Sequence, residues 1–272
     1  MLTVAKMNKR KICIIITVTA IILLLACELF GGLVLNKISD ETTRTLVNMA
    51  VTRAIGSVVF ITILTYLGYK VMNPLKKPLG RSLLFTLPAI LVVVNNLPIY
   101  PLSVGIAEVT SPLWKIILLA AECLFIGIFE EFCFRGVIFL GFLEKRRVSK
   151  WGQLLAIILT SAVFGAVHLV NLLTGGSPLA VFLQVGYSFL IGSMCAVILM
   201  KSKNIWLISL LHAVFDFCGA LVPTCGEGTI WEPLTVTVTA VLAVFTAVYM
   251  TVAFLKIKPC ELDGIYQKKR ES

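Results

Sequence analysis

The stretch IILLAAECLFIGIFEEFCFRGVIFLGFL, from Ile116 to Leu143, is apolar throughout except for three acids and one arginine. It is longer than the roughly 20 residues that an α-helix needs to cross the hydrocarbon core of a bilayer. The whole chain shares this character, because 58% of its 272 residues are hydrophobic and only 14% are charged. Such a composition lies far outside the range of soluble globular domains and indicates an integral membrane protein.

Seven more apolar runs of similar length lie on either side of this stretch. We therefore predict an all-α, polytopic membrane helix bundle of about eight transmembrane helices. We expect one integral membrane domain over residues 1–272 that is multi-pass in the cell (plasma) membrane. The predicted spans are Ile12–Leu35, Leu46–Tyr69, Leu83–Tyr100, Ile116–Leu143, Trp151–Leu173, Leu179–Met200, Ile205–Val222 and Leu234–Leu255.

Positive charge is concentrated in alternate loops, as expected for loops on the cytoplasmic side. We therefore expect both termini to be cytoplasmic. The net charge of +10 follows from this topology, and no polar segment is long enough to present a basic face, so we expect no nucleic-acid partner. The basic residues of these loops and termini are Lys6, Lys9, Arg10, Lys11, Lys70, Lys76, Lys77, Arg81, Lys145, Arg146, Arg147, Lys150, Lys201, Lys203, Lys256, Lys258, Lys268, Lys269 and Arg270.

Three local features of the sequence have explanations of their own. Asn95 and Asn96 together with Pro98 and Pro101 predict a kink or break in the third run, where the amides can hydrogen-bond between helices. The residues before Cys27 resemble a lipoprotein signal, but the apolar run continues through Leu35, so we expect an uncleaved first span. The eight cysteines are scattered, with no CxxC pair, and are interpreted as small apolar fillers.

Ionisable residues inside the predicted spans need an explanation, because a charge at mid-bilayer costs about 2.5–3.5 kcal/mol on insertion scales. Glu28, Arg53 and Glu122 lie nearer the span ends, where their side chains can reach polar surroundings. The remaining six fall on three spans. They are Glu130, Glu131, Arg135, His168, His212 and Asp216.

The fourth span carries two adjacent acids with different surroundings. Glu131 and Arg135 are four residues apart, with the acid first, which favours an ion pair on one helical face. Glu130 is turned by about 100° from Glu131 and is less easily neutralised by that arginine. One carboxylate is therefore interpreted as structural and the other as available for chemistry.

The fifth and seventh spans each carry one of the two histidines of the chain. Phe164 and His168 are four residues apart on one face, and so are His212 and Asp216, so that the aspartate can orient the imidazole or share a ligand with it. Two intramembrane histidines together with a spare glutamate on a third span favour a convergent cluster over isolated helix-to-helix hydrogen bonds.

The three motifs EExxxRG from Glu130, FxxxH from Phe164 and HxxxD from His212, in this order, resemble the CPBP family of intramembrane endopeptidases. This family is also called the Abi or CAAX-protease-like family. The resemblance covers about residues 122–217 and implies an all-helical membrane protease with its core at about residues 116–222. Relatives cleave prenylated CAAX proteins, and bacterial relatives are linked to peptide or bacteriocin processing and to self-immunity.

Carried over by motif, the resemblance makes Glu130 the catalytic acid. Glu131, His168, His212 and Asp216 would complete the site, with support from Arg135 and Phe164. Many members have Asn where this chain has Asp216, which leaves open whether that residue donates a hydrogen bond or binds a cation.

Peptide hydrolysis fits these residue types without the resemblance. It needs an activated water, a stabiliser for the developing oxyanion and a proton for the leaving amine. Glu130 can take a proton from water and return it later, while His168 or His212 hydrogen-bonds the oxyanion. Equally, Glu130, His168, His212 and Asp216 are candidate ligands of a divalent metal such as zinc. Cys133 lies near the glutamates, although neither it nor any serine lies in a recognisable nucleophile motif.

The predicted function is hydrolysis of a peptide bond in a membrane-associated protein or peptide. Two alternatives stay open at this point: a non-catalytic protein of the same fold, with a role in bacteriocin self-immunity or as a membrane scaffold, and an ion- or proton-coupled transporter. A transporter predicts paired broken helices and internal symmetry, of which only the break near Pro98 is evident.

The shared site also requires a tilted or kinked helix. Glu130 lies near the middle of its span, whereas His168 lies about 9 Å beyond the centre of its own.

Overall fold

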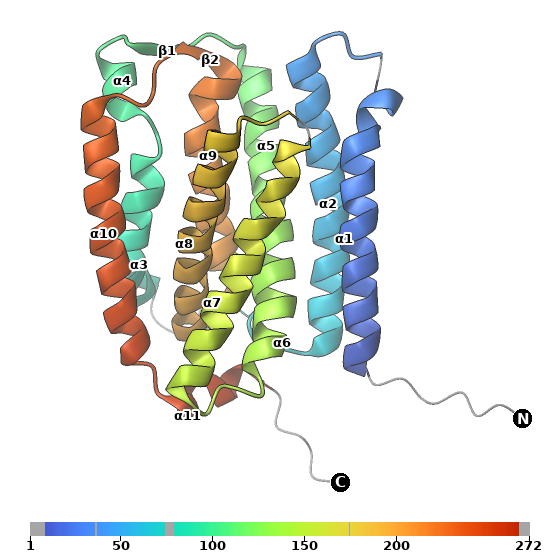
Figure 1. Cartoon of the computed structure of the whole chain (residues 1–272), viewed down its shortest axis with the longest axis vertical. Helices are drawn as coiled ribbons and strands as arrows, with labels where there is room; N and C mark the ends of the chain where they lie inside the picture. Colours follow the sequence, from blue (N-terminus) through green and yellow to red (C-terminus); the bar gives the residue numbers. More distant parts are fainter. Residues whose placement is uncertain (1–8, 36, 74–78, 174, 267–272) are drawn as a thin grey trace, which may run out of the picture.

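The computed structural model describes residues 9–35, 37–73, 79–173 and 175–266. Each predicted span coincides with a helical segment, and the segments lie side by side in one bundle (Figure 1). The elements are α1 (Lys9–Val34), α2 (Glu41–Leu67), α3 (Leu79–Asn95), α4 (Ile99–Ser103), β1 (Ala107–Val109), α5 (Leu113–Glu130), η1 (Glu131–Phe139), α6 (Leu140–Leu143), α7 (Lys150–Val167), η2 (His168–Leu172), α8 (Pro178–Ser202), α9 (Ile205–Cys225), β2 (Gly226–Gly228), α10 (Pro233–Leu255), α11 (Pro259–Leu262) and η3 (Asp263–Ile265).

Five of the described helices are long and apolar enough to cross a membrane: α2, α7 with η2, α8, α9 and α10. Shorter apolar helical stretches cover Ile12–Cys27 and Leu84–Asn95. Only 17% of the most apolar window of α10 is buried inside the protein, so most of its apolar surface needs lipid or another partner. The chain is therefore a predominantly helical, multi-pass membrane bundle.

The predicted break in the third span is confirmed. Helix α3 ends at Asn95, residues 96–98 connect it to α4, and α4 begins at Ile99. Proline removes a backbone donor and disfavours helical geometry in the residue before it, which explains an interruption at this point.

The long run from Leu113 to Leu143 is a helix throughout, but nine of its residues, Glu131–Phe139, form a π-helix. At its end the backbone N–H of Leu140 donates to the carbonyl of Arg135, which is five residues earlier. The π-helix is in contact with α2, α7, α8 and α9, and all but one of its residues are buried. Glu131 and Arg135, the ionisable residues of the π-helix, therefore face protein rather than lipid.

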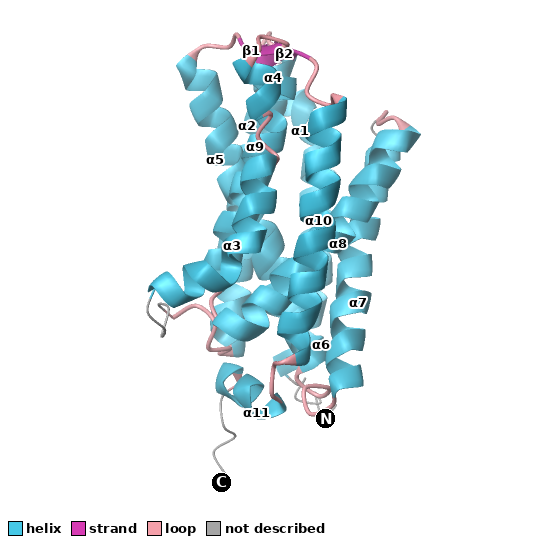
Figure 2. Cartoon of the chain, turned by 90° about the vertical axis from the view of Figure 1, so that its left-hand side faces the viewer, coloured by secondary structure: helices cyan, strands magenta, loops and turns pink. Residues whose placement is uncertain are grey.

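The structure departs from the predicted all-α architecture by containing two short strands, β1 and β2. β1 pairs antiparallel with β2, with Glu108 opposite Glu227, at the end of the bundle opposite α11 (Figure 2). Gly226 and Gly228 allow this contact, because a Cβ on either would lie within 2.2 Å of a backbone oxygen of the partner segment. No hydrophobic periodicity marks three-residue strands, which is why they were not predicted.

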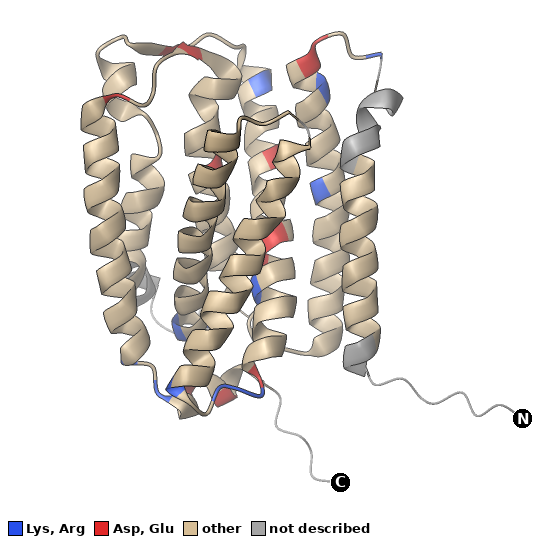
Figure 3. Cartoon of the chain, viewed as in Figure 1, with Lys and Arg blue, Asp and Glu red and all other residues tan. Residues whose placement is uncertain are grey.

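The opposite end of the bundle is closed by the segment that follows α10. The side chains of Leu262 and Ile265 are fully buried, and the Tyr266 hydroxyl donates to the Leu140 carbonyl at 2.9 Å. Most of the described lysines and arginines lie at this end (Figure 3). The remaining residues of the predicted cytoplasmic set, Lys6, Lys76, Lys77, Lys268, Lys269 and Arg270, lie outside the described residues.

Candidate active site

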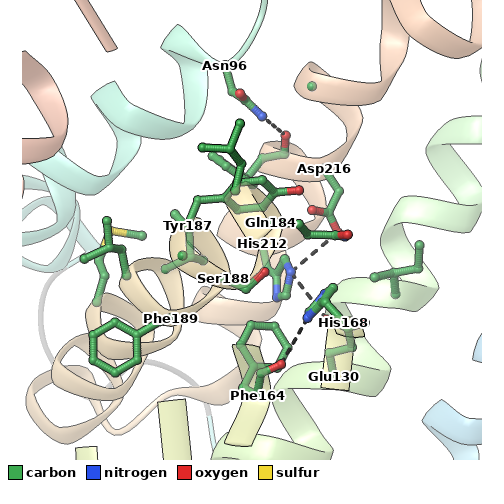
Figure 4. Close-up of a pocket in the computed structure, with 18 of the residues that line it drawn as sticks. Asn96, Glu130, Phe164, His168, Gln184, Tyr187, Ser188, Phe189, His212 and Asp216 are labelled. Carbon is green, nitrogen blue, oxygen red and sulfur yellow. Dashed lines mark hydrogen bonds and ion pairs between the residues drawn. The ribbon is translucent and has the colours of Figure 1, made fainter. Parts of the chain in front are cut away.

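A cavity of about 1930 Å³ lies among the helices of the bundle and opens to its surface, where exposed side chains such as Leu183 and Trp231 line it. Glu130 at the end of α5, His168 in η2, and His212 and Asp216 on α9 all contribute to its lining, together with Phe164 on α7. Figure 4 shows Glu130, His168, His212 and Asp216 among the residues that line this cavity. The structure thus brings the predicted residues of three separate spans to one cavity.

His212 contacts three carboxylates and is 5% exposed. Its Nδ1 lies 2.8 Å from Glu131 Oε1, while its Nε2 lies 3.7 Å from Glu130 Oε2 and 3.5 Å from Asp216 Oδ2. The short bond to Glu131 determines which way the ring faces, so Glu131 rather than Asp216 orients the imidazole. If Glu131 is ionised, Nδ1 carries a proton, because a carboxylate can only accept.

Glu131 and Arg135 form the predicted ion pair, with Arg135 Nη1 3.3 Å from Glu131 Oε1. Both residues are almost completely buried, and neither lines the cavity. The Arg135 guanidinium also lies over the Phe164 ring, 4.0 Å from its centre, a cation–π arrangement that offsets part of the cost of burial. Gly192 on α8 leaves room for it, because a Cβ there would lie 2.3 Å from Arg135 Nη2.

Phe164 is the packing centre of the site. Its ring meets those of His168 and His212 edge-on, at 5.2 and 5.9 Å between centroids. Its backbone carbonyl lies 3.0 Å from His168 Nδ1. Because a carbonyl only accepts, Nδ1 carries the proton, and Nε2 of a neutral His168 is free to accept one. The α-helix gives way to a 3-10 turn at this histidine.

Glu130 differs from its neighbour as predicted. Its side chain is 13% exposed and lines the cavity, whereas that of Glu131 is fully buried. No ion pair joins Glu130 to Arg135 within the described part of the chain. Glu130 is therefore the acid of this pair that meets the cavity.

Several lining residues were not singled out from the sequence. Gln184, Tyr187 and Ser188 place polar groups on one face of α8, and Asn96 enters from the break after α3 (Figure 4). The three α8 residues could have been found from the sequence, because they are polar side chains at helical spacing inside an apolar run. The contact between Glu131 and His212 had no such signal, because 81 residues separate them.

Two chemical alternatives can be compared with this geometry. Cys133 is fully buried in the hydrophobic core and does not line the cavity, so it is not placed as a nucleophile. Among the described residues, no group of three or more His, Cys, Asp or Glu side chains is arranged to hold a metal ion. The four candidate ligands, Glu130, His168, His212 and Asp216, are therefore not gathered into such a group in the described part of the chain.

Residues 112–218 match the family model described as type II CAAX prenyl endopeptidase, Rce1-like. This match confirms the resemblance to the CPBP, or CAAX-protease, family over the segment that carries all three motifs. No curated protein and no solved structure gave a significant match. This segment of the chain is therefore similar to the type II CAAX prenyl endopeptidases that the model describes.

Proposed function

We propose that the protein hydrolyses a peptide bond in a membrane-associated protein or peptide, with Glu130 activating the water. The observation that carries this proposal is that Glu130, His168 and His212 come from three separate segments and line one cavity. A glutamate in a cavity among apolar helices that also exposes a histidine able to accept a proton at Nε2 is suited to general acid–base catalysis.

In the proposed reaction Glu130 takes a proton from a water molecule as the water oxygen attacks the carbonyl carbon of the scissile bond. His168 Nε2, which belongs to the same cavity, accepts a hydrogen bond from that water and orients it. When the tetrahedral intermediate collapses, the carbon–nitrogen bond breaks and Glu130 returns the proton to the leaving amine. One water is consumed, and the residues return to their starting states.

His212 is the proposed donor to the oxyanion. A protonated imidazole donates from both nitrogens, and the bond from Nδ1 to Glu131 at 2.8 Å holds the ring so that Nε2 points toward the cavity. Glu131 and Arg135 act through His212 and are positioning residues. Asp216, 3.5 Å from the same Nε2, holds it between substrates.

The decisive experiment is cleavage of leader-like and lipidated reporter peptides in proteoliposomes. We expect Glu130→Gln to reduce the cleavage rate by at least about a hundredfold, because general acid–base catalysis contributes on that order. The matched control is Glu227→Gln, an exposed glutamate on β2, which should cleave at the wild-type rate.

Addition of a chelator tests metal dependence in the same assay. We expect no loss of cleavage, because the described residues do not form a metal site. If Glu130→Gln still cleaves, the assignment of Glu130 is wrong. If the wild-type protein cleaves none of the peptides, a non-catalytic immunity or scaffold role gains support.

We also propose that all of the predicted spans cross the membrane, with both termini cytoplasmic and the protein in the cell membrane. The gathering of basic residues at the end of the bundle that carries α11 supports this orientation.

A further inference from the structure

Asn96 is the first residue beyond α3, at the break in the third span. Its side-chain Nδ2 donates to the backbone carbonyl of Phe215 on α9 at 2.7 Å (Figure 4). Asn96 also lines the cavity that contains Glu130 and Asp216. The amide thus joins a broken helix to the helix that carries two residues of the site.

The Phe215 carbonyl, which accepts this hydrogen bond, lies in the turn of α9 that carries His212 and Asp216. Phe215 immediately precedes Asp216 and follows His212 by three residues, so all three share one turn of α9. A hydrogen bond from another helix to this carbonyl restrains both the rotation of α9 and its position along its axis. Either movement would change the distances from His212 Nε2 to Glu130 and Asp216, which are 3.7 and 3.5 Å.

Gly219, one turn further along α9, provides the space for this contact. A Cβ at Gly219 would lie 2.5 Å from Asn96 Nδ2, closer than nonbonded atoms approach. On the α8 side, the Phe215 ring packs against Tyr187 at 6.1 Å between centroids. The turn is therefore held from two directions.

The neighbouring residue makes a chemically equivalent contact elsewhere. Asn95 Nδ2 donates to Thr239 Oγ1 on α10 at 2.8 Å. No residue of the proposed catalytic set lies on α10. Asn95 thus offers a matched control for Asn96, with the same side chain at the end of the same helix.

We propose that Asn96 is a positioning residue, which fixes the turn of α9 that presents His212 and Asp216 to the cavity. The catalytic consequence rests on the proposed function, whereas the placement of His212 can be measured without any substrate.

The first test uses the fact that the chain has only two histidines. In protein labelled with ¹⁵N-histidine, each ring gives its own NMR signals, and a His168→Gln sample assigns them. Asn96→Leu keeps the size of the side chain but removes the donor. We expect it to shift the His212 signals and leave those of His168 in place. Gly219→Ala, which displaces the amide from the other helix, should shift the same signals.

Asn95→Leu serves as the control, with thermal unfolding in detergent to verify that each variant is folded. The proposal is overturned if His212 is unaffected by Asn96→Leu, or if Asn95→Leu shifts it equally. Either result would mean that the Asn96 contact serves the bundle in general rather than the site.

The second test is kinetic. With a peptide that the wild-type protein cleaves, we expect Asn96→Leu to lower kcat by about tenfold or more and to leave KM within about twofold, because misplacement by a fraction of an ångström affects the transition state most. Asn95→Leu should change neither. An unchanged kcat for Asn96→Leu would refute positioning. A wild-type protein without any cleavage would refute the proposed function, while the histidine spectra still decide the role of Asn96.

Discussion

At the scale of single residues, the site is defined by which carboxylate contacts which ring nitrogen of His212. Glu131 is fully buried and bonds to Nδ1, whereas Glu130 and Asp216 lie near Nε2 and line the cavity. The ion pair with Arg135, at 3.3 Å, offsets part of the free-energy cost of burying the Glu131 carboxylate. Two acids that are adjacent in sequence thus have separate environments and separate proposed roles.

Asp216 can be tested by substitution at this scale. Many members of the CPBP family, which this chain resembles, have Asn at this position. We expect Asp216→Asn to retain cleavage within about tenfold, since the amide keeps the size and the hydrogen-bonding capacity of the side chain. Asp216→Ala should lose more, because it removes the partner of His212 Nε2. The measurement is the initial rate on one reporter peptide. Equal losses in both variants would indicate that the negative charge itself is required.

At the scale of elements, the close contact between α5 and α9 sets the geometry of the site. Gly127 on α5 faces α9 so closely that a Cβ would lie 2.5 Å from the Ser209 carbonyl oxygen and 2.8 Å from the Ala213 nitrogen. Small residues commonly mediate such approaches between membrane helices. The adjacent His212 is thereby held near Glu130 and Glu131.

Gly127→Ala should force the two helices apart and destabilise the protein by about 1–3 kcal/mol, the usual cost of overpacking. The control is Gly186→Ala on α8, where a Cβ would meet nothing within 4 Å. This change should be neutral or stabilise by up to about 1 kcal/mol, because alanine restricts the unfolded chain. Unfolding by SDS in mixed micelles measures both. A Gly127→Ala protein as stable as Gly186→Ala would contradict the contact.

Helix caps at the end of the bundle opposite α11 give a prediction about pH. The Thr43 side chain and then Lys115 hold the pKa of Asp40, the N-cap of α2, below its ordinary value of 3.8. A hydrogen bond from Thr235 lowers the pKa of Glu232, the N-cap of α10, below 4.5. For a lowered pKa, the stabilisation is present above the ordinary value and is lost as the pH falls through the lower, folded value.

Amide hydrogen exchange in the first turns of α2 and α10 should therefore accelerate, relative to the helix centres, as the pH falls below these values. In Asp40→Asn the first turn of α2 should lose this dependence on pH, while that of α10 keeps it. Exchange in α2 that still responds to acid in Asp40→Asn would show that another group is responsible.

At the scale of the whole molecule, the arrangement has two distinct ends. The paired strands lie at one end, and α11 with most of the described basic residues lies at the other (Figures 2 and 3). Lys201 in the last turn of α8 pairs with Glu261, and Arg147 pairs with Asp263, so cationic side chains at this end hold the C-terminal segment against the bundle. The proposed orientation places this end in the cytoplasm.

Thiol labelling tests the orientation directly. Cys260 in α11 is exposed, and a membrane-impermeant maleimide should label it in inside-out vesicles but not in right-side-out ones. The exposed Cys27 is replaced by serine in this experiment. A cysteine introduced by Glu227→Cys, on β2, should show the opposite pattern. Labelling of Cys260 in right-side-out vesicles would reverse the proposed topology.

The sequence by itself determined the class of the protein and the identity of the candidate residues. Apolar runs long enough to span a bilayer predict helices whatever their neighbours are, and charges inside them are costly enough to mark a site. The ion pair of Glu131 with Arg135 and the break after Asn95 were likewise predictable, because both depend on residues close in the chain. Features of this kind can be predicted from the spacing of residues along one helix.

Only the tertiary structure decided which groups meet across helices. The contact of Glu131 with His212, the bond from Asn96 to Phe215 and the convergence of His168 with Glu130 depend on the tilt and rotation of separate helices. These angles follow from packing at many positions, such as the close approach at Gly127, and no single run encodes them. The π-helix at Glu131–Phe139 and the short strands depend in the same way on the surrounding bundle.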